Sequence, residues 1–377
     1  METNFGRSTP YSVGIEEEYQ IVDGSSLALV AEVEPILSSF RGEIVESRIT
    51  PELLQCVIEV STKISSTIPD AIDDLVDLRE RVGSAAEAHG TLIASAGTHP
   101  FSRYEAQQVT QRPRYTRLAR RLHWVGRRQL TFGLHVHVGV SSAEKAIACA
   151  NGVRRFLPEL LALSANSPFW QGRPTGLAST RASVLESLPR SGIPPFFDSM
   201  AEFEELVDSG VRGGIFADAT YLWWDVRPHP RFGTIEVRIC DAQTRIEDTA
   251  AIAALVQSLV ATLGSAFECG EPPREESLLV LAENKWRAMR DGLEARFVDP
   301  CSMVEQPAEE AIRSLVERCE PAADALGCAE ELGLVEHILC RGTGADEQRR
   351  IYRQTDSLRE VTAAVVGDTT PNGAYAR

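Results

Sequence analysis

The chain has 377 residues, with 38 Lys plus Arg against 54 Asp plus Glu and a formal net charge of −16. This excess of negative charge argues against a nucleic-acid groove or an anionic membrane surface as partner, because like charges repel before contact. Hydrophobic residues make up 43% and charged residues 24%, as in ordinary soluble globular proteins, so disorder and collagen-like repeats are excluded.

The N-terminal residues, the apolar runs and the cysteines predict a cytoplasmic protein with reduced thiols. Residues 1–14 lack an apolar core followed by a small-residue cleavage site, so they do not resemble a secretory signal. The most apolar run, 250–263, is interrupted by Gln257 and Ser258 and is too short to cross a bilayer. None of the eight cysteines forms a Cys-x-x-Cys pair, which favours free and mostly buried thiols.

In chain order, the hydrophobic periodicity predicts helices over 68–88, with Thr67 as N-cap, over 143–165 and over 246–267. Residues 168–195 are rich in Pro, Gly and Ser and predict a long ordered loop of the kind kept for function. From residue 275 onward the pattern is almost entirely helical. No linker interrupts the chain, so we expect one domain over 1–377, with a flexible tail at 368–377.

Four segments predict strands whose polar residues share one face: 13–21, 53–60, 134–140 and 234–241. Successive side chains of a strand point to opposite faces, so the parity of the residue number separates core from surface. Glu17 falls on the mostly apolar face of the first segment, and the pattern offers no reason for it. The polar faces collect Glu16, Glu18, Glu59, His135, His137, Glu236 and Arg238.

If the four segments pair in one sheet, their carboxylates repel one another unless cations hold them together. Carboxylates with imidazole and no thiolate suit Mg²⁺ or Mn²⁺. A guanidinium beside them, that of Arg238, suits a transferring phosphate group. Each motif alone also has an ordinary interpretation, as a solvated strand face, a core His-x-His or a cross-strand ion pair. Their coincidence in four segments favours a site.

The motifs Glu16-x-Glu18, Gly133-x-His135-x-His137 and Glu236-x-Arg238, in this order, resemble the signature of glutamine synthetase-like ligases. More closely, the runs GIEEEYQIVD, AGTHPFSRY, FGLHVHVGV, LWWDVRPHPRFGTIEVRICDAQT, ENKWRAMRDGL and RGTGADEQRR are similar to the type 2 glutamate-cysteine ligase family, the carboxylate-amine ligases. The resemblance covers residues 12–350.

This resemblance implies an α+β fold, with an antiparallel active-site sheet backed by helices and a largely helical C-terminal third. It also implies ATP and Mg²⁺ (or Mn²⁺) as cofactors, and amide formation through an acyl phosphate. By motif, Glu16, His135 and Glu236 would hold one metal, and Glu18 with Glu59 the other. His137 would contact a phosphate, and Arg238 would stabilise the transferred phosphoryl group.

No P-loop and no Gly-x-Gly-x-x-Gly motif is present, so scattered side chains must contribute to substrate binding. The further substrate-binding candidates are His99, Arg181, Arg190, Arg227, Asn284 and Arg287. For His99 a surface turn, and for Arg190 a solvated loop charge, are equal alternatives, whereas Trp286 is expected to pack. The basic stretch from Arg112 to Arg128 predicts a solvated helix, with ATP steering or a partner subunit as alternatives.

Three classes of function follow: an ATP-dependent ligase, a metal-dependent hydrolase using His135-x-His137, and a catalytically silent protein with the ligase fold. The ligase is favoured because the hydrolase would need further His or Asp ligands and gives Arg238 no role. The expected partners are small-molecule carboxylate and amine substrates, with neither nucleic acid nor membrane, and a homo-oligomer stays open. The expected product is γ-glutamyl, with cysteine as one acceptable amine among several.

Overall fold

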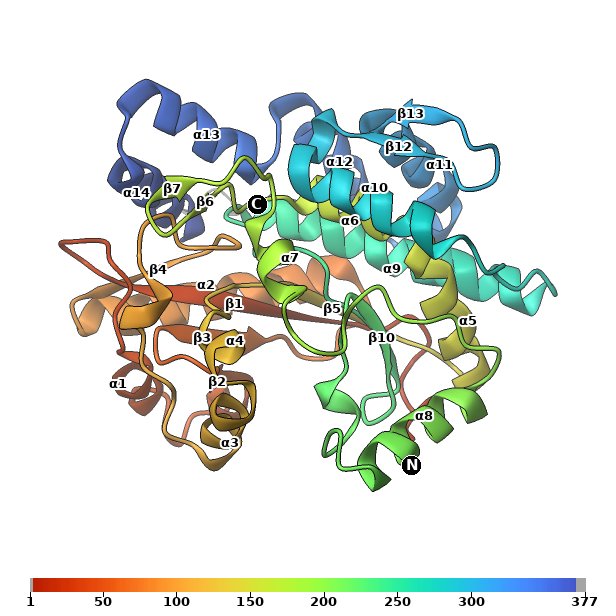
Figure 1. The fold of residues 1–377 in the computed structure, drawn as a ribbon, viewed down its shortest axis with the longest axis horizontal. Helices are drawn as coiled ribbons and strands as arrows, with labels where there is room; N and C mark the ends of the chain where they lie inside the picture. Colours follow the sequence, from red (N-terminus) through yellow and green to blue (C-terminus); the bar gives the residue numbers. More distant parts are fainter. Residues whose placement is uncertain (1–2, 371–377) are drawn as a thin grey trace.

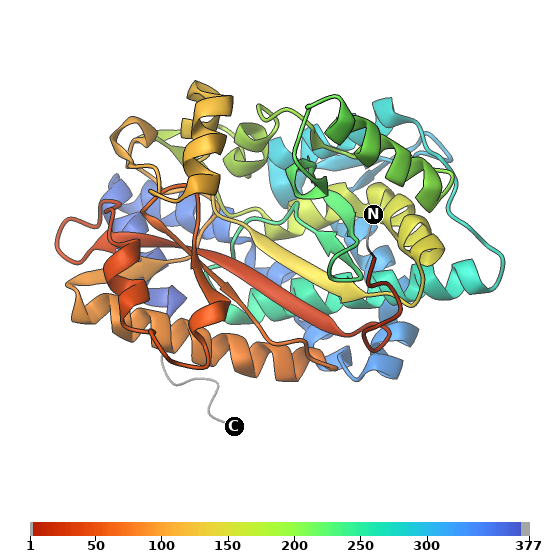
Figure 2. The same ribbon diagram turned by 90° about the horizontal axis from the view of Figure 1, so that it is seen from below.

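The computed structural model describes residues 3–370 and is built around a seven-stranded antiparallel sheet (Figures 1 and 2). The strand order is β10-β11-β5-β1-β3-β2, and β4 also pairs with β1. The strands are β1 (Val13–Asp23), β2 (Ile49–Pro51), β3 (Val57–Ser61), β4 (Thr91–Ala94), β5 (Leu134–Gly139), β10 (Val226–His229) and β11 (Thr234–Val237). The predicted antiparallel sheet with helices behind it is therefore confirmed.

Helices cover one face of this sheet. The two long ones, α2 (Ile68–Ala88) and α9 (Ile246–Glu268), pack against β1 and β5 respectively. The 68–88 prediction is confirmed to the residue, and the Thr67 side chain accepts a hydrogen bond from the Asp70 amide, as an N-cap does. The smaller helices of the first half are α1 (Val33–Ser38), α3 (Pro113–Leu122), α4 (Trp124–Arg127), α7 (Thr180–Leu185) and α8 (Met200–Arg212).

By length and composition, helix α9 is apolar enough to cross a membrane, contrary to the expectation that no such stretch exists. However, 78% of its most apolar stretch is buried inside the protein. Helices α5 (Ala143–Val153), α11 (Ala308–Leu326) and α12 (Ala329–Arg341) pack around it (Figure 1). Its apolar residues therefore serve as the core of the helical layer.

The expected helix at 143–165 is divided. It consists of α5 (Ala143–Val153), a 3-10 turn over Arg154–Phe156 and α6 (Leu157–Ser164). Pro158 lies in the first turn of α6, where its missing amide costs nothing, whereas inside one continuous helix it would break a hydrogen bond. The sequence interpretation missed this proline signal.

Two other segments differ from expectation. The strand predicted over 53–60 begins at Val57, because Gln55 and Cys56 form a turn. The predicted loop 168–195 contains α7, capped by Ser179, and the short strands β6 (Phe169–Trp170), β7 (Arg173–Pro174) and β8 (Ser191–Gly192). β8 pairs with β9 (Trp223–Trp224).

The C-terminal third is helical as predicted, except for one hairpin. It contains α10 (Leu278–Asp291), α11 (Ala308–Leu326), α12 (Ala329–Arg341), α13 (Gly344–Thr355) and α14 (Leu358–Thr369), with β12 (Arg296–Val298) pairing with β13 (Glu305–Pro307). Within the tail expected over 368–377, α14 continues to Thr369, and Thr369 is buried. Residues 371–377 of that expected tail lie outside the described residues.

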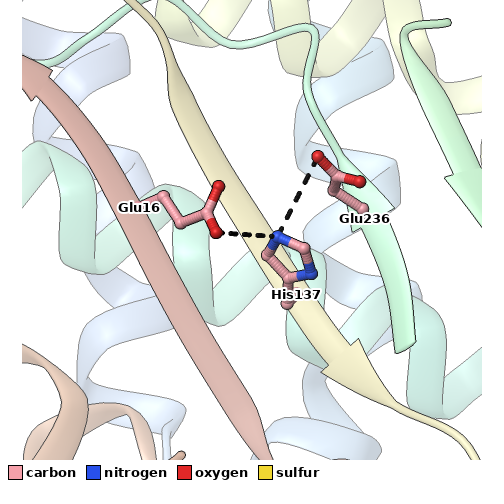
Figure 3. A group of neighbouring side chains, drawn as sticks. All are labelled: Glu16, His137 and Glu236. Atoms are coloured by element: carbon pink, nitrogen blue, oxygen red, sulfur yellow. Dashed lines mark ion pairs between the residues drawn. The ribbon is translucent and has the colours of Figure 1, made fainter. Parts of the chain in front are cut away.

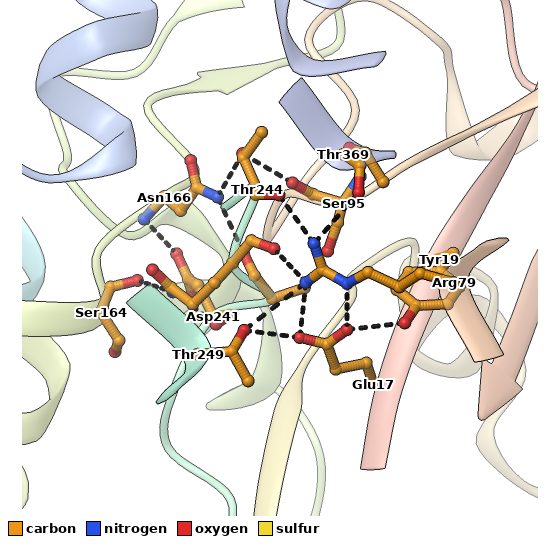
Figure 4. Close-up of polar contacts among 12 residues, drawn as sticks. Glu17, Tyr19, Arg79, Ser95, Ser164, Asn166, Asp241, Thr244, Thr249 and Thr369 are labelled. Atoms are coloured by element: carbon orange, nitrogen blue, oxygen red, sulfur yellow. Dashed lines mark hydrogen bonds and ion pairs between the residues drawn. The ribbon is translucent and has the colours of Figure 1, made fainter. Parts of the chain in front are cut away.

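The structure explains Glu17, which faces the helices rather than the open side of the sheet (Figure 4). Both its carboxylate oxygens bond Arg79 of α2, at 2.7 and 2.8 Å, and both residues are fully buried. The hydroxyls of Tyr19 and Thr249 also donate to this carboxylate, each at 2.6 Å. Arg79 donates in addition to the carbonyls of residues 243, 244 and 369, so the buried ion pair is fully hydrogen-bonded.

Candidate active site

The Glu17 side chain lies on the face of the sheet that the helices cover, so the side chains of its neighbours Glu16 and Glu18 project from the opposite face. The strand register then places Glu16 opposite His135 of β5 and Glu18 opposite Glu59 of β3. On the other side of β5, His137 lies opposite Glu236 of β11. Strand pairing thus assembles all the residues of the expected metal site on one surface.

The first group of close ligand atoms comes from three strands: Glu16, His137 and Glu236 (Figure 3). The His137 Nε2 lies 3.5 Å from a Glu16 oxygen and 3.9 Å from a Glu236 oxygen. This nitrogen is buried and has no hydrogen-bond partner among the described residues. Its other ring nitrogen, Nδ1, contacts the Thr234 hydroxyl at 3.0 Å, which orients the imidazole.

Two further groups continue the site along β1. Glu16, Glu59 and His135 form the second, and Glu18, Glu52 and Glu59 form the third; within each group the ligand atoms lie within 4.8 Å of one another. We call the seven residues of the three groups the acidic cluster. His137, rather than the expected His135, lies with Glu16 and Glu236, whereas His135 lies with Glu16 and Glu59.

Glu52 is the residue that the sequence interpretation missed. It follows β2 directly, and Thr50 of β2 lies opposite Glu59 in the register. Residues 50 and 52 are two apart, so in a strand their side chains point to the same face. A predicted strand that began at Ile49 would have placed Glu52 on the same face as Thr50, which lies opposite Glu59. Pro51 lies between these two residues, and a proline within a segment argues against a strand because it has no amide hydrogen to donate.

The three carboxylates of the third group all have raised pKa values. Burial, and then the charge of Glu52, raise the pKa of Glu18 to about 7. Burial raises the pKa of Glu59 well above its ordinary range, and the neighbouring carboxylates Glu16, Glu52 and Glu18 raise it further. Burial likewise raises the pKa of Glu52. Three half-buried carboxylates whose oxygens lie within 4.8 Å of one another are a composition that divalent cations stabilise.

In the first group, the negative charge of Glu236 is balanced by the guanidinium groups of Arg227 and Arg238. Burial opposes ionisation of Glu236, but the guanidinium groups of Arg227 and Arg238 hold its pKa well below the usual range. Arg227 donates through Nε and Nη2 to the two Glu236 oxygens, at 2.6 and 3.2 Å, and through Nη1 to the carbonyls of residues 220 and 222. Arg227 therefore positions Glu236, whereas Arg238 bonds Glu236 and also borders an open pocket.

Two pockets border the acidic cluster at opposite ends. The first, which we call the apolar pocket, takes Glu18, Glu52, His135 and Arg238 from the cluster side. Its remaining wall is dominated by apolar side chains: Leu53, Leu54, Val57, Leu118, Leu122, Leu185, Leu188, Trp223 and Trp224. The second, which we call the N-terminal pocket, takes Glu16, His137 and Thr234 together with Asn4, Arg7, Ile64, Arg231 and Phe232.

Arg181 lines the apolar pocket from α7, and its side chain is buried. Its Nη1 and Nη2 donate to the carbonyls of Ile239 and Arg238, both at 2.9 Å, so it supports the backbone that carries Arg238. Gly133 makes room for this arrangement, since a Cβ there would collide with the Arg181 guanidinium. Residues 3–370 supply hydrogen-bond acceptors for two of the five N–H donors of this guanidinium, and the Asp241 carboxylate lies 3.8 Å from its Nη1.

Asp225 and Lys285 form an ion pair of 2.7 Å that the sequence interpretation did not single out. Asp225 lines the apolar pocket, and Lys285 is buried behind it with Glu186 as a second partner at 3.1 Å. Lys285 lies in the family-like run ENKWR, which was the available signal.

The remaining candidates lie away from the acidic cluster. His99 is buried, not in a surface turn, and its ring nitrogens bond the Leu27 carbonyl and the amides of residues 101 and 102. Burial lowers its pKa to about 4. Arg190 has its guanidinium 5.2 Å from the centre of the Trp223 ring and donates to the Tyr221 carbonyl.

In α10, Asn284 and Arg287 hold the β12–β13 hairpin. Asn284 exchanges two hydrogen bonds with Val298, and Arg287 pairs with Glu305 at 2.7 Å. Trp286 is 42% exposed, so its expected packing role is wrong. The basic stretch forms α3 and α4, and no residue of α3 is buried, as expected of a solvated helix.

The fold is shared with solved ligases. The structure of glutamate–cysteine ligase from Francisella tularensis in complex with AMP is similar, with a TM-score of 0.70 and 15% identity, covering 96% of this chain and 90% of the other. A bifunctional glutathione synthetase from Pasteurella multocida gives a TM-score of 0.72 at 15% identity, with 96% of this chain and 52% of that chain covered. The chain thus shares its fold with these two ligases.

At the level of sequence, the model of "Glutamate-cysteine ligase family 2 (GCS2)" matches residues 12–365. A Rubrobacter xylanophilus protein, provisionally named glutamate–cysteine ligase 2-1, is 44% identical over 361 residues, which are 96% of this chain and 95% of the relative. A Sorangium cellulosum protein with the provisional name glutamate–cysteine ligase 2 is 43% identical over 352 residues, 93% of this chain and 94% of the relative. The chain belongs to glutamate–cysteine ligase family 2.

Proposed function

We propose that this protein is an ATP-dependent carboxylate–amine ligase that forms an amide through an acyl phosphate, acting in the cytoplasm on glutamate or a related acid. The observation that carries the proposal is the acidic cluster between two pockets, with Arg238 lining the apolar pocket and bonded to Glu236 of the cluster. A ligase of this kind needs a nucleotide site and an acid–amine site that meet at the transferring phosphate.

The donor set of the acidic cluster fits Mg²⁺ or Mn²⁺: five carboxylates, two imidazoles and no thiolate. The unpartnered His137 Nε2 and the raised pKa values of Glu18 and Glu59 support this fit. Each of the three groups described above would hold one cation. Bound divalent metal neutralises charge on phosphate oxygens during phosphoryl transfer.

We assign ATP to the N-terminal pocket. It offers the cationic side chains of Arg7 and Arg231 for phosphates and the apolar surfaces of Ile64 and Phe232 for a base. The His137 end of the cluster opens into this pocket. The γ-phosphate would then point along β1 and β5 toward Arg238.

We assign the acid and the amine to the apolar pocket. Arg181 has donors left for a substrate carboxylate, and Arg238 would stabilise the phosphoryl group as charge develops on it. Apolar walls discriminate by only about 1–3 kcal/mol per methylene, so they support a site that accepts several amines, cysteine among them.

The test supplies ATP, Mg²⁺ and glutamate with single amines, measures phosphate release and identifies the amide by mass. We expect phosphate release that depends on both acid and amine, with products from more than one amine. Product from cysteine alone, at a rate typical of a dedicated enzyme, would overturn broad amine acceptance. Absence of any amide with glutamate would remove the acid assignment, and absence of amide with every acid tested would remove the ligase proposal.

A further inference from the structure

A separate pocket is lined by the end of α5, the 3-10 turn over Arg154–Phe156, the connection between α9 and α10, and residues of α9, α10 and α11. None of its lining residues belongs to the acidic cluster or to the two pockets beside it. Four arginines line it: Arg154, Arg155, Arg274 and Arg318.

Arg154 is the central observation. The residue is only 3% exposed, and its Nε has no hydrogen-bond partner among residues 3–370. Burial lowers the pKa of this guanidinium, and the nearby charges of Glu275 and Glu276 only partly oppose that effect. A buried cation without a bonded counter-charge is costly, so its retention needs a reason.

The charge balance of the pocket points the same way. Arg155 is already paired, with Glu276 at 2.6 Å and Asp299 at 2.7 Å. The four lining arginines face two lining glutamates and Asp299, and burial raises the pKa of the neighbouring Glu159 to about 7, so one positive charge is in excess while Glu159 is protonated. This local excess occurs in a chain whose net charge is −16.

Aromatic packing holds the guanidinium groups in place. The Phe156 ring lies 5.7 Å from Arg155 and 5.7 Å from Arg318, while Arg154 lies 5.6 Å from the Phe196 ring. Planar guanidinium groups held this way are preorganised for oxygen acceptors, because little side-chain entropy is lost on binding.

We propose that this pocket binds a small oxyanion, carrying phosphate or carboxylate groups, with Arg154 as the main contact. The site lies outside the ligase machinery, so it would act as an effector site. The ligand's oxygens would supply the hydrogen bonds that the Arg154 guanidinium lacks.

Cys301 provides a local reporter, because it lines this pocket and is exposed. Its Sγ lies 3.6 Å from the Arg155 Nη1. Cys340 on α12 is also exposed but lies outside the pocket lining, and so serves as the internal control. The test measures alkylation of both thiols by neutral iodoacetamide, by peptide mass spectrometry, with inorganic phosphate or citrate against chloride at equal ionic strength.

At an anion concentration ten times Kd, we expect Cys301 labelling to slow about tenfold while Cys340 labelling is unchanged. The protection should vanish in Arg154→Met and persist in Arg238→Gln, which alters only the proposed active site. Preference for phosphate over citrate, or the reverse, identifies the anion class. If Arg154→Met does not fold, the double variant R274Q/R318Q, which changes two exposed side chains, is expected to weaken the protection.

Equal rates with and without either anion would overturn the proposal. So would equal slowing at Cys301 and Cys340, or protection that survives Arg154→Met. Protection that vanishes in Arg238→Gln would assign the effect to the ligase site instead. Because the readout is thiol labelling, failure of this proposal and failure of the ligase proposal are distinguishable.

Discussion

The Glu236 carboxylate is bonded by two guanidinium groups, those of Arg227 and Arg238, which have different roles. Arg227 uses its donors on Glu236 and on backbone carbonyls, whereas Arg238 also borders the apolar pocket. Fixing the carboxylate through one arginine leaves the other available to an incoming phosphoryl group. The alternation of polar residues predicted Glu236 and Arg238 correctly as neighbours on one face, but nothing in it revealed that Arg227 would be occupied by Glu236.

We expect Arg238→Lys to lower turnover by about a hundredfold or more while ATP affinity changes little, because lysine keeps the charge but loses the planar fork. Steady-state phosphate release gives turnover, and nucleotide titration gives affinity. Arg353→Lys, on an exposed residue of α13, is the matched control. Near-normal turnover in Arg238→Lys would show that Arg238 only pairs with Glu236 and does not stabilise the transferred phosphoryl group.

Glu52 tests the third group of the acidic cluster. Glu52→Gln keeps the shape of the side chain but removes one of three carboxylates that lie within 4.8 Å of each other. We expect the affinity for Mg²⁺ or Mn²⁺ to fall by about tenfold or more, as measured by calorimetric titration. Glu87→Gln, on an exposed position of α2, should bind metal normally, and equal affinities in the two variants would remove Glu52 from the site.

At the scale of elements, periodicity was most reliable where one long pattern met a clear cap, as in α2. It failed where a local signal competed with the pattern: Pro158 divided the 143–165 helix, and the turn at Gln55–Cys56 shortened β3. The alternation of side chains nevertheless placed Glu59 on the correct face. Glu59 lies inside the paired part of β3, opposite Glu18, so the later start of the strand does not change the face to which it points. The spatial order of the strands depends on long-range pairing, which no single segment encodes.

Helix α6 supplies a pH-dependent prediction. Glu159 lies in its first turn, and burial raises its pKa to about 7 from an ordinary value of 4.5. Between these values the folded protein holds a proton that the unfolded chain releases, so stability falls as pH rises through that window.

The parent protein should therefore lose about 2–3 kcal/mol of stability between pH 5 and pH 8 that Glu159→Gln does not lose. Urea unfolding at the two pH values measures this difference, with Glu317→Gln, an exposed position of α11, as control. An identical pH dependence in parent and Glu159→Gln would show that Glu159 does not titrate in this window.

At the scale of the molecule, the Glu17–Arg79 pair joins the sheet, α2, α9 and the end of α14 (Figure 4). We expect Arg79→Met or Glu17→Gln alone to cost about 3–5 kcal/mol, because each leaves a buried charge without its partner. The double variant should cost less than the sum of the two. Chemical unfolding measures all three.

Arg81→Met, two residues away on the same helix, removes only exposed ion pairs and should change stability by less than about 1 kcal/mol. Strict additivity of Arg79→Met and Glu17→Gln would contradict the coupling.

The Arg79 network also has a consequence for how the protein folds. Its hydrogen bonds span 62 residues to Glu17, 164 and 165 residues to Gln243 and Thr244, and 290 residues to Thr369. Any intermediate that forms the sheet before α14 docks would lack an acceptor of this buried arginine, so partly folded states are penalised and the two ends of the chain order together. In native-state hydrogen exchange, the amides of β1 and α14 should therefore open with the same free energy, as one cooperative unit.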